Sequence, residues 1–468
     1  MLRQYIGGRA FYRRVLALAL PIMVQNGITN FVSMLDNVMV GQVGTVQMTG
    51  VAVANQLVFV FNLCIFGAVS GAGIFGAQYF GCGDQQGVRH TFRFKLMICV
   101  ALTVLCGAVF LLWGDPLIGA YLRGEGNAAD AAASLSYARN YLRVMLVGLI
   151  PYAIVQCYSS TLRESGQTVL PMVAGLVAVG VNLCFNYVLI FGKMGAPRLG
   201  VLGAAVATVI SRFVELGIVA VWTRTHADRN PFILGAFRSL YVPAKLMQQI
   251  ALKGLPLMLN ETFWAAGMAM LNQCYSVRGL DVVAANNISA TFFNVFSVAF
   301  LSVGTSIGII LGQLLGAGKA EEARDSSRKL IAFSVFISVL VAVVYAVCAE
   351  FIPHIYNTEP DIRRTATRLM QISALAFPLD AFANASYFTL RSGGKIMVTI
   401  LFDSCFVWVV QVPAALLLSR LTPLPILPLY AVCQLLSIVK CVLGYWLVKK
   451  GVWIRKIVSD TRTAAETA

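Results

Sequence analysis

The feature that most constrains this chain is the length of its uncharged, apolar runs. No Asp, Glu, Lys or Arg occurs from Asn37 to Gly83 or from Val282 to Gly318. Both runs exceed the roughly 20 residues with which a helix crosses a bilayer. Only 12% of the 468 residues are charged, whereas about 25% is usual in soluble proteins. The chain is therefore predicted to be an integral membrane protein.

Twelve segments are long and apolar enough to be spanning helices when the chain is divided at its charged and turn-forming residues. The predicted fold class is an all-α integral membrane protein with twelve transmembrane helices. The predicted spans are 15–40, 51–77, 96–113, 142–162, 168–191, 200–222, 251–276, 282–310, 330–350, 367–390, 396–418 and 424–448.

The two halves of the sequence resemble each other. A shift of 235 residues aligns Gln78–Arg89 with Gln313–Arg324 without a gap, and a shift of 228 aligns Thr161–Arg163 with Thr389–Arg391. Because six is even, two six-helix halves would enter the membrane in the same direction, as parallel transporter repeats do. Internal duplication therefore predicts a six-helix bundle at 1–222, a cytoplasmic linker at 223–250, and a six-helix bundle with a cytoplasmic tail at 251–468.

The basic residues predict the orientation in the membrane. With the N-terminus inside, 24 Lys and Arg residues fall in inner segments and 10 in outer segments. Cytoplasmic loops are enriched in these residues, so both termini are predicted to be cytoplasmic in a multi-pass protein of the cell membrane. This bias also explains the net charge of +16 without a nucleic-acid partner. The 11 Cys and 3 His residues show neither a disulfide framework nor a metal-binding spacing.

Several short motifs, spread over nearly the whole chain, together resemble the multidrug and toxic compound extrusion (MATE) family. They are Leu20-Pro21 followed by Asp36, Gly-Ala-Gln at Gly76–Gln78, NYVLIFG at Asn186–Gly192, GVLGAAVAT at Gly200–Thr208, PLD at Pro378–Asp380 and TLRSGG at Thr389–Gly394.

The resemblance implies a secondary antiporter rather than an enzyme. An H⁺ or Na⁺ gradient would drive the export of small organic compounds, often cationic or amphipathic, through a cavity between the halves by alternating access. No cofactor other than the coupling ion is implied, and we expect a monomer in the lipid bilayer. Two alternatives are a lipid-linked oligosaccharide flippase of related architecture and a membrane-embedded transferase.

Asp36 is the leading candidate for the coupling site in the first half. Ionisable residues within spans are costly and are functional candidates by default. Its carboxylate could bind Na⁺ or carry a proton, and the sequence does not choose between them. The family resemblance adds Asn182, Asn186 and Thr208 as neutral ligands near Asp36. The alternative is that these polar side chains only join neighbouring helices.

In the second half, Glu261 and Asp380 are candidates for a second cation-coupling site, which could hold Na⁺ between them. Asp380 matches the family's tenth-span aspartate, whereas Glu261 is about one helical turn from the expected seventh-span position. Asp403 either lines the cavity or hydrogen-bonds to backbone. Lys440 is either a snorkelling residue or a cavity cation, and Arg212 with Glu215 is interpreted as a snorkelling surface pair.

The substrate cavity is predicted to have adaptable walls, because Met and aromatic side chains suit binding of varied compounds. The alternative for each residue is ordinary packing or contact with lipid. The predicted cavity residues are Met34, Asn55, Phe59, Asn62, Trp264, Phe292, Asn294 and Asp403.

Overall fold

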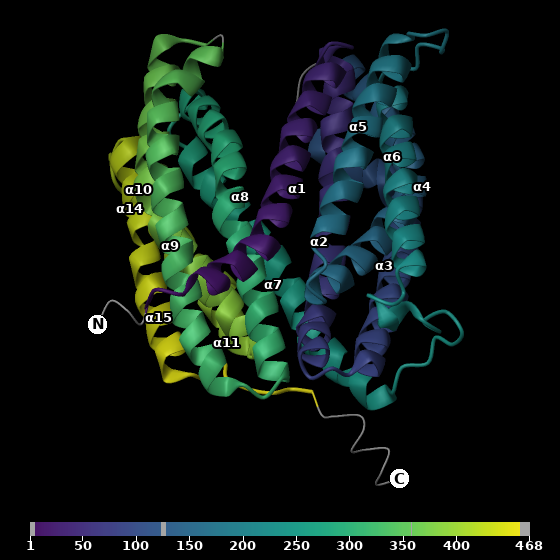
Figure 1. Cartoon of the computed structure of the whole chain (residues 1–468). Helices are drawn as coiled ribbons and strands as arrows, with labels where there is room; N and C mark the ends of the chain where they lie inside the picture. Colours follow the sequence, from purple (N-terminus) through teal and green to yellow (C-terminus); the bar gives the residue numbers. More distant parts are fainter. Residues whose placement is uncertain (1–4, 123–127, 357, 459–468) are drawn as a thin grey trace. The chain divides into compact units, whose positions relative to one another are not determined.

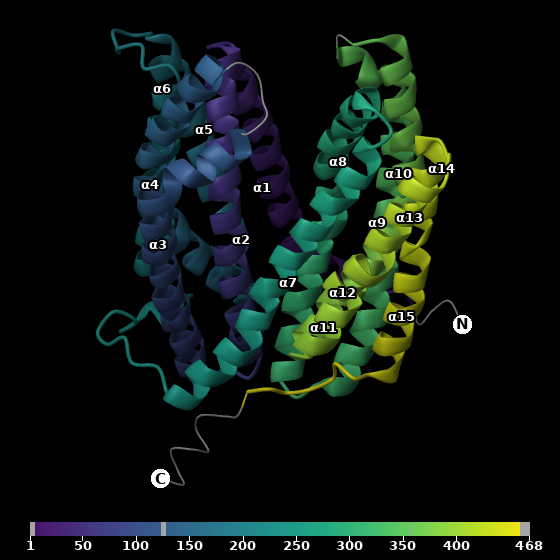
Figure 2. The same cartoon turned by 180° about the vertical axis from the view of Figure 1, so that it is seen from behind.

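All regular structure is helical in the computed structural model, which describes residues 5–122, 128–356 and 358–458 (Figures 1 and 2). The side chains at 34, 37, 38, 128 and 280 also lie outside the described part. The helices are α1 (Arg9–Gly41), α2 (Thr45–Gly81), α3 (Gln85–Leu122), α4 (Ala128–Glu164), α5 (Val169–Phe191), α6 (Val201–Thr225), α7 (Ala244–Ser276), α8 (Leu280–Gly316), α9 (Ala320–Phe351), α10 (Pro360–Ser392), α11 (Ile396–Phe402), α12 (Ser404–Phe406), α13 (Val412–Leu421), α14 (Ile426–Leu435) and α15 (Ser437–Lys450), with short 3₁₀ turns at Pro231–Ile233 and Ile352–Ile355 and a π-helical segment at Val407–Gln411.

The helices correspond to the twelve predicted spans. The eleventh span consists of α11 to α13 and the twelfth of α14 and α15. Ten spans of the described chain are long and apolar enough to cross a membrane by length and composition alone. The other two are α7 and α10, which carry the polar residues Glu261, Asp380 and Arg391. These two helices thus carry ionisable groups along their length, as α1 does with Asp36 and α6 with Glu215.

The chain divides into two compact units. The N-terminal unit contains Val24–Gly76 and Gln85–Met258, and the C-terminal unit contains Met1–Met23, Ala77–Asp84 and Leu259–Ala468. The bundle limits predicted from the duplication, with a linker at 223–250, stay a prediction.

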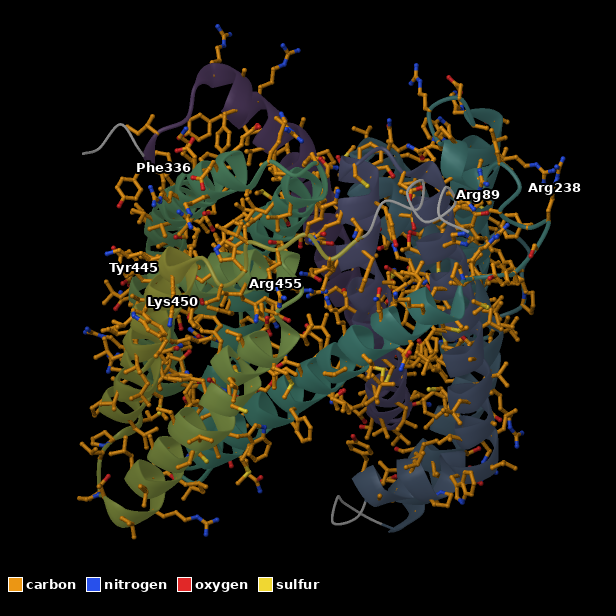
Figure 3. The ribbon with its side chains drawn as sticks, turned by 90° about the horizontal axis from the view of Figure 1, so that it is seen from below. Arg89, Arg238, Phe336, Tyr445, Lys450 and Arg455 are labelled. Carbon is orange, nitrogen blue, oxygen red and sulfur yellow. The ribbon has the colours of Figure 1, made fainter. Side chains whose placement is uncertain are left out.

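Within the N-terminal unit, α6 packs against α4 and α5, and α3 packs against α4. The segment after α6 is held against α3 by arginines. Arg89 Nε donates to the carbonyl of Phe232 at 3.2 Å, and Arg93 Nη2 donates to that of Gly235 at 2.8 Å. Phe232 is fully buried, whereas Arg238 points outward in the view from below (Figure 3). The segment predicted as a linker is thus docked on its own unit.

Within the C-terminal unit, α10 is the central helix and packs against α8, α9, α14 and α15. An aromatic cluster forms its core around Phe377. The ring centroids of Phe293, Phe300 and Tyr345 lie 5.1 to 5.5 Å from that of Phe377. Tilted and edge-to-face arrangements of this kind are the favoured ones for aromatic pairs.

The repeated Gln-x-x-Gly motifs of α2 and α8 lie against each other, backbone to backbone. A Cβ atom on Gly81 would overlap the carbonyl group of Gln313, and a Cβ atom on Gly316 would overlap that of Gln78. The contact is therefore reciprocal, as expected where two copies of one segment meet. Glycine is required because small residues allow helix backbones to approach this closely.

The same glutamines hold different partners in the two repeats. Gln313 Oε1 accepts a hydrogen bond from Arg14 Nη2 at 3.0 Å. The fully buried Gln78 instead hydrogen-bonds to the segment that follows α15. Its Nε2 donates to the carbonyl of Arg455 at 3.2 Å, and its Oε1 accepts from the N–H of Ile457 at 2.8 Å. This segment, seen from below with Arg455 labelled in Figure 3, also buries Trp453 completely.

We expect Gly316→Ala to destabilise the protein by about 1–3 kcal/mol, because the added methyl group would overlap the Gln78 carbonyl. The measurement is the thermal unfolding midpoint in detergent. Gly107→Ala is the matched control, since a Cβ there would have no atom within 4 Å apart from its chain neighbours and the nearby backbone of its own helix. Equal midpoints for the two variants would contradict the close crossing.

Candidate functional site

Four polar side chains meet inside the N-terminal unit, and we call them the Asp36 cluster: Asp36 of α1, Asn182 and Asn186 of α5, and Thr208 of α6. Nδ2 of Asn186 donates to Oδ1 of Asp36 at 2.6 Å and to Oδ1 of Asn182 at 3.1 Å. Nδ2 of Asn182 donates to Oγ1 of Thr208 at 3.2 Å. The structure therefore brings together the four residues that the sequence analysis grouped.

The α5–α6 hairpin explains how the neutral members of this cluster converge. Asn182 and Asn186 are four residues apart and share one face of α5. Helix α5 ends at Phe191, and the left-handed conformation of Gly192 (φ 68°), which follows it, turns the chain towards α6. Gly203 of α6 lies so close to Leu189 that a Cβ would collide with its carbonyl group. This tight packing positions Thr208 beside Asn182.

Neutral polar atoms surround the Asp36 carboxylate. Turning the Asn182 amide by 180° would place its nitrogen 3.1 and 3.2 Å from the two carboxylate oxygens of Asp36. Oδ1 of Asn186 is buried and has no hydrogen-bond partner among the described residues. No ion pair within the described chain includes Asp36. A carboxylate contacted by neutral amide N–H groups, with the Asn186 amide oxygen beside it, can bind a monovalent cation or carry a proton.

Tyr141 belongs beside this cluster and was missed by the sequence analysis. It is buried on α4, hydrogen-bonds with Asn55, and interacts electrostatically with Asp36. A tyrosine in an apolar span carries no local signal of such a role. The contact places Asn55, a predicted cavity residue, near the coupling candidate.

The two acids predicted to share a cation in the second half have separate partners. Oε1 of Glu261 accepts a hydrogen bond from Tyr387 Oη at 2.9 Å and lies 3.8 Å from Arg391 Nη1. Asp380 interacts electrostatically with Lys440 instead. No hydrogen bond or ion pair among the described residues joins Glu261 to Asp380, and no three His, Cys, Asp or Glu side chains there are arranged to hold a metal ion.

Asp403 and Lys440 form an ion pair with each other. The interpretations of these two residues from the sequence did not include this pair. Nζ of Lys440 donates to Oδ1 of Asp403 at 2.6 Å, and Nδ2 of Asn260 donates to Oδ2 of Asp403 at 3.3 Å. Asp403 therefore bonds to side chains rather than to backbone. Lys440 points to a carboxylate inside the unit, so it does not snorkel to the membrane surface.

The predicted cavity residues differ in exposure. Phe59, Trp264 and Asn294 are exposed, whereas Asn55, Asn62 and Phe292 are half-buried. The side chain of Met34 lies outside the described residues. The role of this set in substrate binding stays a prediction.

A buried ion pair joins Lys95 of α3 to Glu164 of α4 in the N-terminal unit. Nζ of Lys95 lies 2.7 Å from both carboxylate oxygens of Glu164, and it also donates to the hydroxyl groups of Ser160 and Thr161. The Lys95 side chain is completely buried. Lys95 is one of the 24 basic residues assigned to inner segments from the sequence, where nothing indicates a partner 69 positions away.

Arg212 and Glu215 do form a pair, with Nη1 and Oε2 3.2 Å apart. Glu215 is buried, however, and the Arg212 guanidinium lies 4.8 Å from the ring centre of Tyr152. Glu215 therefore lies within the unit, which differs from its interpretation as part of a snorkelling surface pair, whereas the Arg212 side chain is 32% exposed. Contacts with α4 account for the difference, because Tyr152 attracts the cation from inside.

Twelve spanning helices with a few ionisable side chains inside them define the class of protein as a multi-pass membrane transporter. The MatE family model matches residues 21–188 and 256–417, which is more than half of the chain. The protein therefore belongs to the MatE family.

Two curated relatives cover most of the chain. The "Probable multidrug resistance protein NorM" of Thermotoga maritima is 27% identical over 416 residues, which are 87% of this chain and 86% of the relative. The "Multidrug resistance protein MdtK" of Yersinia enterocolitica is 27% identical over 411 residues, with 87% of each chain covered.

Two solved structures share the fold. One is an outward-facing multidrug resistance MATE family transporter of the MOP superfamily, with a TM-score of 0.85, 18% identity and coverage of 96% of this chain and 98% of that one. The other, a variant of the Vibrio cholerae MATE transporter VcmN, has a TM-score of 0.83, 17% identity and coverage of 95% and 97%. The protein is thus a transporter rather than an enzyme, and neither the flippase nor the transferase alternative is favoured.

We expect Lys95→Met to destabilise the N-terminal unit by about 3–5 kcal/mol, because it would leave the Glu164 carboxylate buried without its cation. The measurement is thermal unfolding of the purified protein. Lys319→Met is the control, since Lys319 and Glu322 form an exposed pair, and such pairs contribute about 0–1 kcal/mol. A similar midpoint in both variants would contradict the importance of the buried pair.

Proposed function

We propose that the protein exports organic cationic or amphipathic compounds in exchange for H⁺ or Na⁺ by alternating access. The observation that carries this proposal is the Asp36 cluster, a carboxylate from α1 held by neutral groups of α5 and α6. The relatives named as multidrug resistance proteins support the proposed class of substrate.

The coupling role is assigned to Asp36 because its charge has no fixed counter-ion among the described ion pairs. A mobile cation or proton can therefore neutralise it and change the charge of the unit. Glu261 already faces Arg391, so a cation there would compete with a fixed guanidinium. We therefore propose Asp36 as the main coupling site, and Glu261 with Asp380 as a secondary one.

The exchanged ion links binding at Asp36 to the membrane potential. Moving one charge across 100 mV supplies about 2.3 kcal/mol, which corresponds to an about fiftyfold concentration gradient. An exporter coupled in this way needs no nucleotide. The ion biases the equilibrium between two conformations only by binding one of them more tightly.

Asp36→Asn is expected to abolish ion-driven efflux while leaving the fold intact, because Asn keeps the size and polarity of Asp but not its charge. Efflux of a fluorescent organic cation is measured in proteoliposomes, first with a Na⁺ gradient and then with a pH gradient alone. Asp115→Asn serves as the control, since Asp115 pairs with Arg139 at an exposed site. Undiminished efflux in Asp36→Asn would overturn the coupling assignment.

We also propose a cell-membrane location with cytoplasmic termini, on the basis of the 24 to 10 distribution of basic residues. A green fluorescent protein fused to the C-terminus should fluoresce, and alkaline phosphatase fused there should be inactive in a bacterial host. The reverse pair of results would show that the orientation is inverted.

A further inference from the structure

The eleventh span is interrupted at Asp403. Helix α11 ends at Phe402, and Asp403 adopts φ −102° and ψ −81°, after which α12 continues only to Phe406. The π-helical segment Val407–Gln411 follows directly. Figure 2 labels α11 and α12 one after the other, and α11 packs against α15. Breaks and π-helical turns within spans often coincide with binding sites in transporters.

Neutral groups hold the Asp403 carboxylate in place. Asn260 Nδ2 donates to its Oδ2 at 3.3 Å. Ser404 Oγ donates in turn to both the backbone carbonyl and Oδ1 of Asn260, at 2.7 and 2.6 Å. The carboxylate is therefore oriented from one side by α7, and its Oδ1 is left for a cation.

The cation that occupies this position is the ammonium group of Lys440. It lies 2.6 Å from Asp403 Oδ1 and 5.3 Å from the ring centre of Phe402. A carboxylate next to an aromatic ring is a favourable environment for an organic ammonium ion, since the ring face attracts cations. The position of Lys440 thus shows that the space between Asp403 Oδ1 and the Phe402 ring accepts an ammonium group.

The Lys440–Asp403 pair is not completely buried. The side chains of Lys440 and Asp403 are 15% and 14% exposed, whereas the Lys95 side chain, which pairs with Glu164, is fully buried. Lys440 also interacts electrostatically with Asp380 of α10. Cys441 Sγ donates to the carbonyl of Leu379 at 3.3 Å, which keeps α15 next to α10 at this level. A displaced Lys440 therefore has a second carboxylate nearby.

We propose that the break at Asp403 is a binding site for the ammonium group of an exported organic cation, and that Lys440 is its built-in competitor. The incoming ammonium pairs with Asp403 and stacks on Phe402, while Lys440 shifts to Asp380. The exchange leaves each of the two carboxylates with one cation. This inference rests on the proposed export of organic cations.

Lys440→Met tests the competition, because it removes the resident ammonium and keeps the apolar part of the side chain. The dissociation constant of ethidium, an aromatic quaternary ammonium compound, is measured by fluorescence anisotropy on the purified protein. We expect binding to tighten about tenfold, the gain that follows if Lys440 holds Asp403 for about nine-tenths of the time. Unchanged or weaker binding overturns the proposal.

Asp403→Asn keeps the test decisive if Lys440→Met does not fold. It removes the attracting charge, so ethidium binding should weaken about tenfold, and adding Lys440→Met to it should then produce no tightening. Lys329→Met is the matched control, because it removes a lysine from an ion pair with Asp325 in the same unit. A variant that only disturbed packing would bind ethidium more weakly. Tighter binding by Lys440→Met could therefore not result from a loss of packing.

The same measurements separate this inference from the proposed function. Wild-type protein that binds ethidium but does not respond to Lys440→Met or Asp403→Asn overturns the inference alone. Wild-type protein that neither binds nor exports ethidium overturns both. If Asp403→Asn changes the Kd for ethidium but still shows ion-driven efflux in the proteoliposome assay, the result supports separate sites for the organic cation and the coupling ion.

Discussion

The cost of placing charge in an apolar bilayer governs how this protein is built. A charged side chain at the centre of a spanning helix costs about 3 kcal/mol on insertion scales. The described acids within the spans meet that cost in two ways. Glu164 and Asp403 each have a lysine partner within 2.7 Å. Asp36 instead relies on neutral amides. Glu164 and Asp403 thus have a fixed cation beside them, whereas no ion pair among the described residues includes Asp36.

Duplication supplied similar frameworks to the two halves, and their polar chemistry then diverged. The reciprocal crossing through Gly81 and Gly316 uses the same motif in both repeats. Its glutamines have different partners, since Gln313 bonds to Arg14 and Gln78 to the segment after α15. The two proposals extend this asymmetry, with the coupling ion in the N-terminal unit and the organic cation in the C-terminal unit. Such a division lets one ligand bias a conformational equilibrium that the other one also senses.

Local sequence predicted the spans well because a helix in lipid must satisfy its own backbone hydrogen bonds, whatever surrounds it. The break at Asp403 was not predicted, since Asp403 lies in an apolar run without a neighbouring Gly or Pro. The Asp36 cluster was reached through i, i+4 spacing and family motifs. The partners of Glu261 were not predicted, because its contacts with Tyr387 and Arg391 depend on the depth and rotation at which α7 and α10 pack.

The sequence by itself determined that this is a twelve-span, duplicated membrane protein with a few ionisable residues inside the membrane. Apolar length, basic-residue bias and repeat spacing are properties of the chain read in order. Only the tertiary structure decided which charges meet. Lys95 and Glu164 are 69 residues apart, and Asp403 and Lys440 are 37 apart. Such pairs form because helices separated in sequence are packed side by side, and no local pattern encodes which faces come into contact.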